Sequence, residues 1–181
     1  MSLSILHGNI EQQEADAIIT PAMPVPEIGY ELESRIYDTA GREKLLRLRR
    51  ITGDGEDGRI PPGKTGVTPA FSLHAKFLIH TVLPETGDSF EERLYDCYQT
   101  ALRTAAELTC RSAAIPLLAE GLDLLPAKRE LEIASRAIRD YQEDKLNLLT
   151  FALEQDVTIV VRGGEPEAMQ AEKSEAGRDR E

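Results

Sequence analysis

Hydrophobic positions change their period several times along the chain, and the period distinguishes helix from strand. Residues 91–108 place apolar side chains at helical spacing with charged residues on the opposite face, and residues 127–143 repeat the pattern. Residues 30–50 are also helix-like, with a break at Gly41. We therefore expect amphipathic helices in these three stretches.

Short apolar or β-rich runs separate the predicted helices. The strand candidates are residues 15–19, 66–71, 77–82, 112–118 and 146–153. The first is expected to stop at Thr20 and Pro21, and Pro116 to lie at a strand end or bulge. Residues 157–161 fit either a strand or the start of a helix. Strands that alternate with helices of this length predict an α/β layered domain.

The length and composition fit one ordinary domain. The chain has 181 residues, of which 41% are hydrophobic, which is enough for a sizeable core. Apolar residues become rare after Gly163, where charged residues dominate. We expect a folded domain over residues 1–162 and a charged, solvated tail over residues 163–181.

The charge balance excludes some classes of partner. Lys and Arg number 21 against 32 Asp and Glu, a net charge of −11, which disfavours general nucleic-acid binding and binding to anionic membranes. No apolar run approaches the roughly 18–20 residues that span a bilayer, and the N-terminus does not resemble a secretory signal. We expect a cytoplasmic protein in which Cys97 and Cys110 are reduced thiols. No metal ion or cofactor is predicted.

Gly58 to Thr65 satisfies the P-loop pattern, with Lys64 before the final threonine. A working P-loop follows a strand, precedes a helix and offers free backbone N–H groups to phosphate. Here a polar loop precedes the motif, a β-rich run follows it, and Pro61 and Pro62 remove two N–H donors. We interpret the motif as a turn that leads into a strand.

Several separated stretches have the order and spacing of one known family. They are Gly8–Ile10 with residues 15–19, Ala40 with Gly41, residues 61–63 with 75–82 and Pro84, Cys97 and Tyr98 with Ala101 and Leu102, and residues 112–116 with Gly121, Pro126, Ile133 and Ala134. Over about residues 3–160 the chain resembles a macro domain, the ADP-ribose-binding module. The resemblance implies a three-layer α/β/α fold around a mostly parallel mixed sheet, with a ligand cleft at the carboxyl ends of the strands.

The resemblance also implies positions for the adenosine and ribose contacts. Asn9, next to Ile10, stands where the family has an aspartate that accepts a hydrogen bond from the adenine amine, and an amide oxygen can still accept it. The family's Asn-Ala-Ala-Asn sequence is replaced by residues 20–23, which include Ala22. Met23 stands at the last of these positions and cannot make the hydrogen bonds to ribose.

Two loops should surround the diphosphate, and both depart from the family's sequence. The residues implied are Gly29, Tyr30 and Glu31 in the first loop, and Ala119, Glu120, Gly121, Leu122, Asp123 and Leu125 in the second. Glu31 and Glu120 place carboxylates where the family has residues that favour phosphate. A like-charge pair at ~4 Å costs about 1 kcal/mol in water and about 4 kcal/mol at an effective dielectric constant of 20. We therefore expect weak or absent binding of ADP-ribose.

The resemblance makes Glu33 the catalytic candidate, because it stands at the position of an aspartate that is associated with hydrolysis in some members of the family. In the other interpretation, Glu31 and Glu33 are first-turn acids that the helix dipole favours. Three functions stay open. The first is a binder of ADP-ribose or a related nucleotide with weak or lost hydrolase activity. The second is an ADP-ribosyl hydrolase or O-acetyl-ADP-ribose deacetylase. The third is a non-nucleotide scaffold, or a binder of a cation or basic ligand through Glu31, Glu33 and Glu120. The sequence does not give the oligomeric state.

Overall fold

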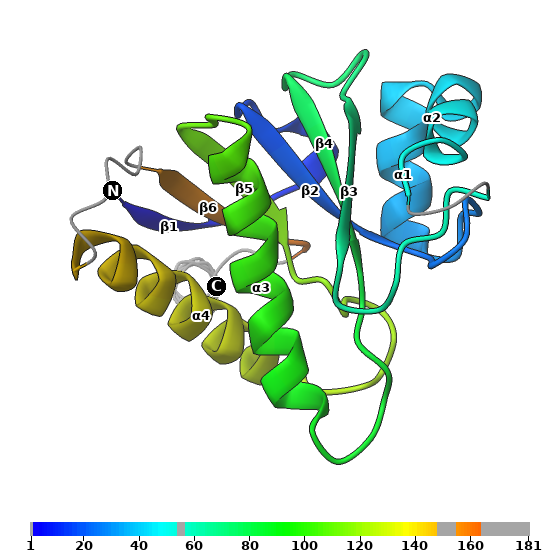
Figure 1. The fold of residues 1–181 in the computed structure, drawn as a ribbon. Coiled ribbons are helices and arrows are strands. Elements are labelled where there is room, and N and C mark those ends of the chain that lie inside the picture. The colour runs from blue at the N-terminus through cyan, green and yellow to red at the C-terminus, as the bar shows by residue number, and fades with distance from the viewer. Residues whose placement is uncertain (1, 54–56, 148–154, 164–181) are drawn as a thin grey trace, which may run out of the picture.

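A computed structural model describes residues 2–53, 57–147 and 155–163 of the chain. Within them, one sheet of six strands has the order β1-β6-β5-β2-β4-β3 (Figure 1). The strands are β1 Leu3–His7, β2 Ala17–Ala22, β3 Thr65–Pro69, β4 Phe77–Val82, β5 Ser112–Pro116 and β6 Asp156–Val161. β3 pairs antiparallel with β4, and the other neighbours are parallel. The sheet is thus mixed and mostly parallel, as expected.

Helices cover both faces of this sheet. They are α1 Glu31–Ala40, α2 Arg42–Arg49, α3 Phe90–Glu107 and α4 Ala127–Asn147, with a short 3-10 helix η1 at Ile10–Gln12. α3 and α4 pack together on one face, and α1 and α2 lie on the other (Figure 1). The layered α/β/α architecture is confirmed.

The buried side chains alternate along the central strands and form a core on each face of the sheet. Ile19 and Ile79 pack with α3 and α4, whereas Ile18 and Leu78 pack with α1 and α2. This two-residue alternation is what a strand with helices on both faces requires. The predicted break at Gly41 is also real, because its φ of 124° is open to glycine and it separates α1 from α2.

Several expectations about element bounds need correction or completion: β3 and β5 end at Pro69 and Pro116, two residues earlier than expected, and α4 continues beyond residue 143. The run at residues 15–19 does not stop at Pro21, because β2 continues to Ala22. The strand expected at residues 146–153 is wrong at its start, where α4 runs to Asn147, and residues 148–154 lie outside the described part. The ambiguous run at 157–161 is strand β6. β1 was not predicted by the pattern, because it is an edge strand with mostly exposed side chains.

Pro21 is tolerated because β2 and β5 separate toward their carboxyl ends. Their pairing comprises Ala17 with Ala113 and Ile18 with Ala114. Beyond Ile18, β2 pairs with β4 alone, so no strand on the β5 side needs the N–H that proline lacks. From here β2 leads to α1 on one face, and β5 leads to α4 on the other (Figure 1). Open α/β sheets bind ligands at such a point, where successive connections leave in opposite directions.

Two local interpretations are confirmed by the structure. β3 begins at Thr65, so the P-loop pattern leads into a strand. Cys97 and Cys110 are free and buried. His80 in β4 is also buried, and its ring lies between the hydroxyl groups of Tyr37 and Thr68. Within the described residues, no helix is long and apolar enough to span a membrane.

Candidate functional site

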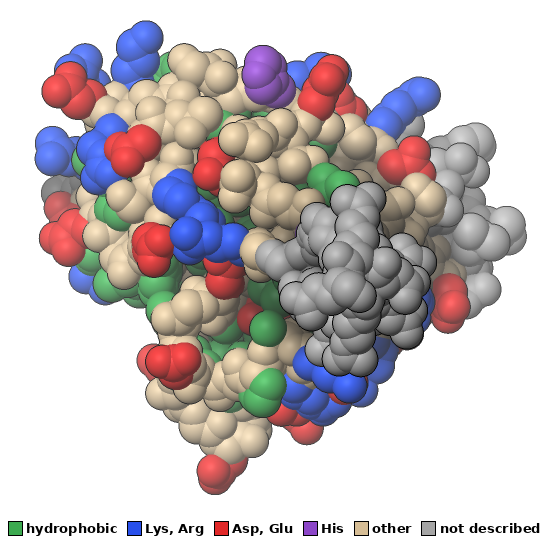
Figure 2. Space-filling view, turned by 180° about the vertical axis from the view of Figure 1, so that it is seen from behind, with side chains coloured by type: hydrophobic (Ala, Val, Ile, Leu, Met, Phe, Trp, Pro, Cys, Tyr) green, Lys and Arg blue, Asp and Glu red, His purple; other side chains and the backbone are tan. Residues whose placement is uncertain are grey.

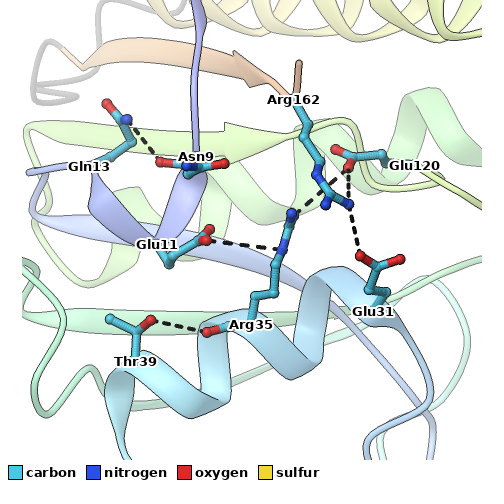
Figure 3. Close-up of polar contacts among 8 residues, drawn as sticks. All are labelled: Asn9, Glu11, Gln13, Glu31, Arg35, Thr39, Glu120 and Arg162. Atoms are coloured by element: carbon cyan, nitrogen blue, oxygen red, sulfur yellow. Dashed lines mark hydrogen bonds and ion pairs between the residues drawn. The ribbon is translucent and has the colours of Figure 1, made fainter.

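Charged side chains from four separate segments meet at the split between β2 and β5. Glu31 and Arg35 lie one turn apart on α1, Glu120 lies on the β5–α4 loop, and Arg162 directly follows β6. Glu11 comes from η1. Figure 3 shows the two guanidinium groups between these carboxylates. We call these five residues the arginine site.

Arg162 links the two loops that sequence analysis assigned to the diphosphate. Its Nη1 donates to Glu31 Oε1 at 3.0 Å and lies 3.9 Å from Glu120 Oε1. The Glu31 side chain is 74% exposed, whereas that of Glu120 is 21% exposed. Burial raises the pKa of the Glu120 carboxyl, and the nearby Arg35 and Arg162 partly oppose this rise. The two carboxylates are therefore paired with cations in the folded chain.

Arg35 is the more buried of the two arginines, with 22% of its side chain exposed. Its Nη2 lies 3.8 Å from Glu120, and its Nε lies 4.0 Å from Glu11. Both contacts are longer than a hydrogen bond. Arg35 Nε and Glu11 Oε2 are buried, and neither has a hydrogen-bond partner in the described part of the chain. Arg35 is thus held by charge, and its buried Nε makes no hydrogen bond with the described residues.

The first predicted loop is packed around Met23. A Cβ placed on Gly29 would lie 2.4 Å from Met23 Sδ, so glycine is what lets the two segments touch. Arg49 also holds this loop, since its Nη2 donates to the carbonyl oxygens of Met23 and Val25. Tyr30 packs against the core of α3 and α4. The loop is therefore held mainly by packing and by backbone contacts.

Glu33 does not point into solvent. It is completely buried, and its Oε1 accepts a hydrogen bond of 2.8 Å from the Gly29 N–H. Burial raises the pKa of the carboxyl to about 7, although the Gly29 N–H and the Arg49 charge act in the opposite direction. One oxygen of Glu33 thus supports the first loop, while its Oε2 is buried without a hydrogen-bond partner among the described residues.

The second predicted loop is fixed by two buried side chains. Glu130 Oε1 accepts hydrogen bonds from the Tyr98 hydroxyl at 2.7 Å and from the Ala119 N–H at 2.8 Å. The Tyr98 oxygen in turn accepts from the Leu118 N–H at 3.0 Å. Glu120 follows immediately, and Gly121 takes a φ of 79° that favours glycine. The position of Glu120 is thus set by hydrogen bonds from the N–H groups of the two preceding residues to side chains of α3 and α4.

Only some of the predicted ligand residues gather at the arginine site. Asn9 lies beside it, because the neighbouring Gly8 donates to Val161 at the end of β6 (Figure 3). The predicted residues that are buried in the interior are Ile10, Ala22 and Ala119. The residues that pack against the core are Tyr30, Leu122 and Leu125. Asp123 is exposed, with φ 53°.

The cation site suggested for Glu31, Glu33 and Glu120 does not form in the structure. No group of three or more His, Cys, Asp or Glu side chains suited to a metal ion occurs among residues that the structure describes. The three carboxylates do not converge, because Glu33 accepts a hydrogen bond from the Gly29 N–H in the interior, whereas Glu31 and Glu120 face Arg162.

Sequence reasoning missed Arg35, Arg162 and Glu11. Arg35 could have been found, because it lies four residues after Glu31 and therefore on the same helix face. Arg162 carried no such signal, since only the pairing of β6 with β5 brings it to the site. In Figure 2, acidic and basic side chains are interspersed on the face seen from behind, without one large patch of either sign.

The comparisons with known proteins identify the family. A family model described as Macro domain matches residues 13–134. The chain belongs to the macro domain family. A macro domain-containing protein of Streptomyces coelicolor is 31% identical over 75% of this chain and 82% of its own length. An O-acetyl-ADP-ribose deacetylase of Klebsiella pneumoniae is 32% identical, over 74% of this macro domain and 77% of the relative. A Thermotoga maritima protein is 35% identical over 77% of this chain, which spans 23% of that relative.

Solved structures agree with the family and the fold. The Oceanobacillus iheyensis macrodomain with ADP has a TM-score of 0.76 and 25% identity, and the match covers 99% of this chain and 93% of that one. A Trypanosoma brucei macrodomain in complex with ADP-ribose has a TM-score of 0.72 at 21% identity and supports the fold alone, covering 87% of this chain and 63% of that one.

Proposed function

We propose that this macro domain binds ADP-ribose, or a related nucleotide with a diphosphate, at the split between β2 and β5. The observation that carries the proposal is the meeting of both predicted diphosphate loops, through Glu31 and Glu120, at the single guanidinium of Arg162. The N-terminus of α1 lies at the same place, and free N–H groups at a helix N-terminus favour anions. The ADP in the Oceanobacillus iheyensis structure supports the same class of ligand.

Binding is expected to be weak. The arginine site holds three carboxylates against two guanidinium groups, so its net charge is −1 before any ligand arrives. Met23 adds no hydrogen bond to a ribose, because its side chain packs against Gly29. We expect a dissociation constant on the order of 0.1–1 mM, which corresponds to about 4–5.5 kcal/mol.

We also propose that hydrolysis of ADP-ribosyl bonds is weak or absent. Glu33 is completely buried and already accepts the Gly29 N–H, so its carboxylate does not reach a bound water or substrate from this position. The likeness to the Klebsiella deacetylase supports the alternative, an ADP-ribosyl hydrolase or O-acetyl-ADP-ribose deacetylase. The free thiols of Cys97 and Cys110 fit the reducing cytoplasm in which we expect the protein.

Calorimetric titration with ADP-ribose tests the binding proposal, with adenosine as a ligand that lacks the diphosphate. Saturable binding in the high-micromolar to millimolar range is expected for ADP-ribose, and weaker binding for adenosine. A low-micromolar dissociation constant would show that the electrostatic reasoning is wrong. Release of acetate from O-acetyl-ADP-ribose at the rate of an active control deacetylase would favour the enzymatic alternative.

A further inference from the structure

We infer that Arg35 and Arg162 are the groups with which this chain recognises a phosphate, and that Glu120 and Glu31 occupy them in the free protein. An anionic ligand then enters by displacing these carboxylates. The inference rests on the proposed function for the identity of the whole ligand. The two guanidinium groups by themselves require only a ligand with two or more phosphate oxygens.

The first observation is the unused hydrogen-bonding capacity of Arg35. A guanidinium carries five N–H donors in a planar fork that matches the oxygens of a carboxylate or phosphate. Both ion pairs of Arg35 are longer than a hydrogen bond, and its buried Nε has no acceptor among the residues that the structure describes. Buried polar groups in proteins are normally hydrogen-bonded, so a buried guanidinium N–H left without an acceptor suits an incoming one.

The second observation is the geometry around Arg162. Its contacts with carboxylates in the described part of the chain all use one nitrogen, Nη1. The side chain is 45% exposed, so the rest of the guanidinium is accessible from solvent. Glu31, which holds it at 3.0 Å, is 74% exposed and can rotate into water without loss of packing.

The third observation is that both cations contact the same carboxylate. Glu120 Oε1 lies 3.8 Å from Arg35 Nη2 and 3.9 Å from Arg162 Nη1, which places it between two guanidinium groups from different elements (Figure 3). An oxygen of a phosphate at this position would meet the same two cations with more charge. Glu120 therefore acts as an internal competitor for the ligand.

Removal of the competitors should strengthen binding, and removal of the cations should weaken it. The double change Glu31→Gln with Glu120→Gln keeps the side-chain shapes and converts the net charge of the site from −1 to +1. We expect it to bind ADP-ribose and inorganic pyrophosphate at least about tenfold more tightly than the parent. Arg35→Gln and Arg162→Gln should each weaken both ligands about tenfold, whereas adenosine should bind all variants alike.

Glu91→Gln is the matched control. Glu91 pairs with Arg129 at 2.7 Å on the surface between α3 and α4, so this change also removes one carboxylate from an ion pair, but away from the arginine site. Its affinities should equal those of the parent. Arg162 is nearly half exposed, so Arg162→Gln should fold, and melting curves of every variant verify this.

Calorimetry with ADP-ribose and pyrophosphate separates this inference from the proposed function. Equal affinity of ADP-ribose for the parent, the double variant and both arginine variants would overturn the inference and leave the proposed function standing. Pyrophosphate binding that follows the expected order, without binding of ADP-ribose to any variant, would uphold the inference and overturn the proposed function. If neither probe binds even the double variant, both are wrong.

Discussion

At the scale of single residues, Glu33 links stability to pH. Its carboxyl has a pKa of about 7 in the fold against a reference value of 4.5, because burial disfavours the charged form. The folded state therefore binds the proton more tightly than the unfolded state. The contribution of this group is most favourable below about pH 4.5 and is lost as the pH rises through 7.

The change Glu33→Gln should accordingly stabilise the protein at pH 8 and have little effect at pH 4. The difference in pKa sets an upper limit of roughly 3 kcal/mol, at about 1.36 kcal/mol for each pKa unit. Chemical denaturation of parent and variant across this pH range measures the gain. Glu27→Gln, which alters an exposed carboxyl of the same loop, is the control. A gain that is independent of pH would contradict the explanation by burial.

At the scale of elements, Tyr98 on α3 ties the β5–α4 loop to the body of the domain. The change Tyr98→Phe removes the donor to Glu130 and the acceptor for the Leu118 N–H, and leaves both groups buried. We expect a loss of about 1–3 kcal/mol in the free energy of unfolding, seen as a lower melting temperature. Hydrogen exchange at Leu118 and Ala119 should also become faster.

Tyr95→Phe is the matched change on the same helix. The Tyr95 hydroxyl donates to Asp140 in a partly exposed position, so water can replace the lost partner. A smaller loss of stability is expected, without faster exchange in the β5–α4 loop. Equal effects of the two changes would show that Tyr98 has no special role in holding the loop.

At the scale of the whole molecule, charge decides which polyanions can approach. The net charge of −11 predicts that duplex DNA does not bind at physiological salt, and the face drawn in Figure 2 has no large basic patch. Fluorescence anisotropy of a labelled duplex should stay flat as protein is added, with a basic DNA-binding protein as the positive control. A rise in anisotropy that salt abolishes would reveal a local basic surface strong enough to overcome the net charge.

The hydrophobic pattern by itself was sufficient for the layered fold. Buried central strands and amphipathic helices alternate with distinct periods, so 77–82, 91–108 and 112–118 could be placed from the sequence, although β5 ends at Pro116. Gly41 marked the break between α1 and α2. β1 was not predicted because the exposed side chains of an edge strand leave no such pattern. Pro21 misled the prediction because its meaning depends on whether a neighbouring strand needs its N–H.

The chemistry of the candidate site was decided by tertiary structure. The sequence places Glu31 and Glu120 in the two loops and gives their charge, but charge along a chain does not say which cation lies opposite. Arg35 on α1 lies close to Glu120, which is far away in the sequence. Arg162 lies close to both carboxylates because β6 pairs with β5 and ends beside them. Coulomb energies depend on distance and burial, and only the packed fold sets these two quantities. The same fold buries Glu33 and places its carboxylate against the Gly29 N–H, which the charge pattern along the chain does not indicate.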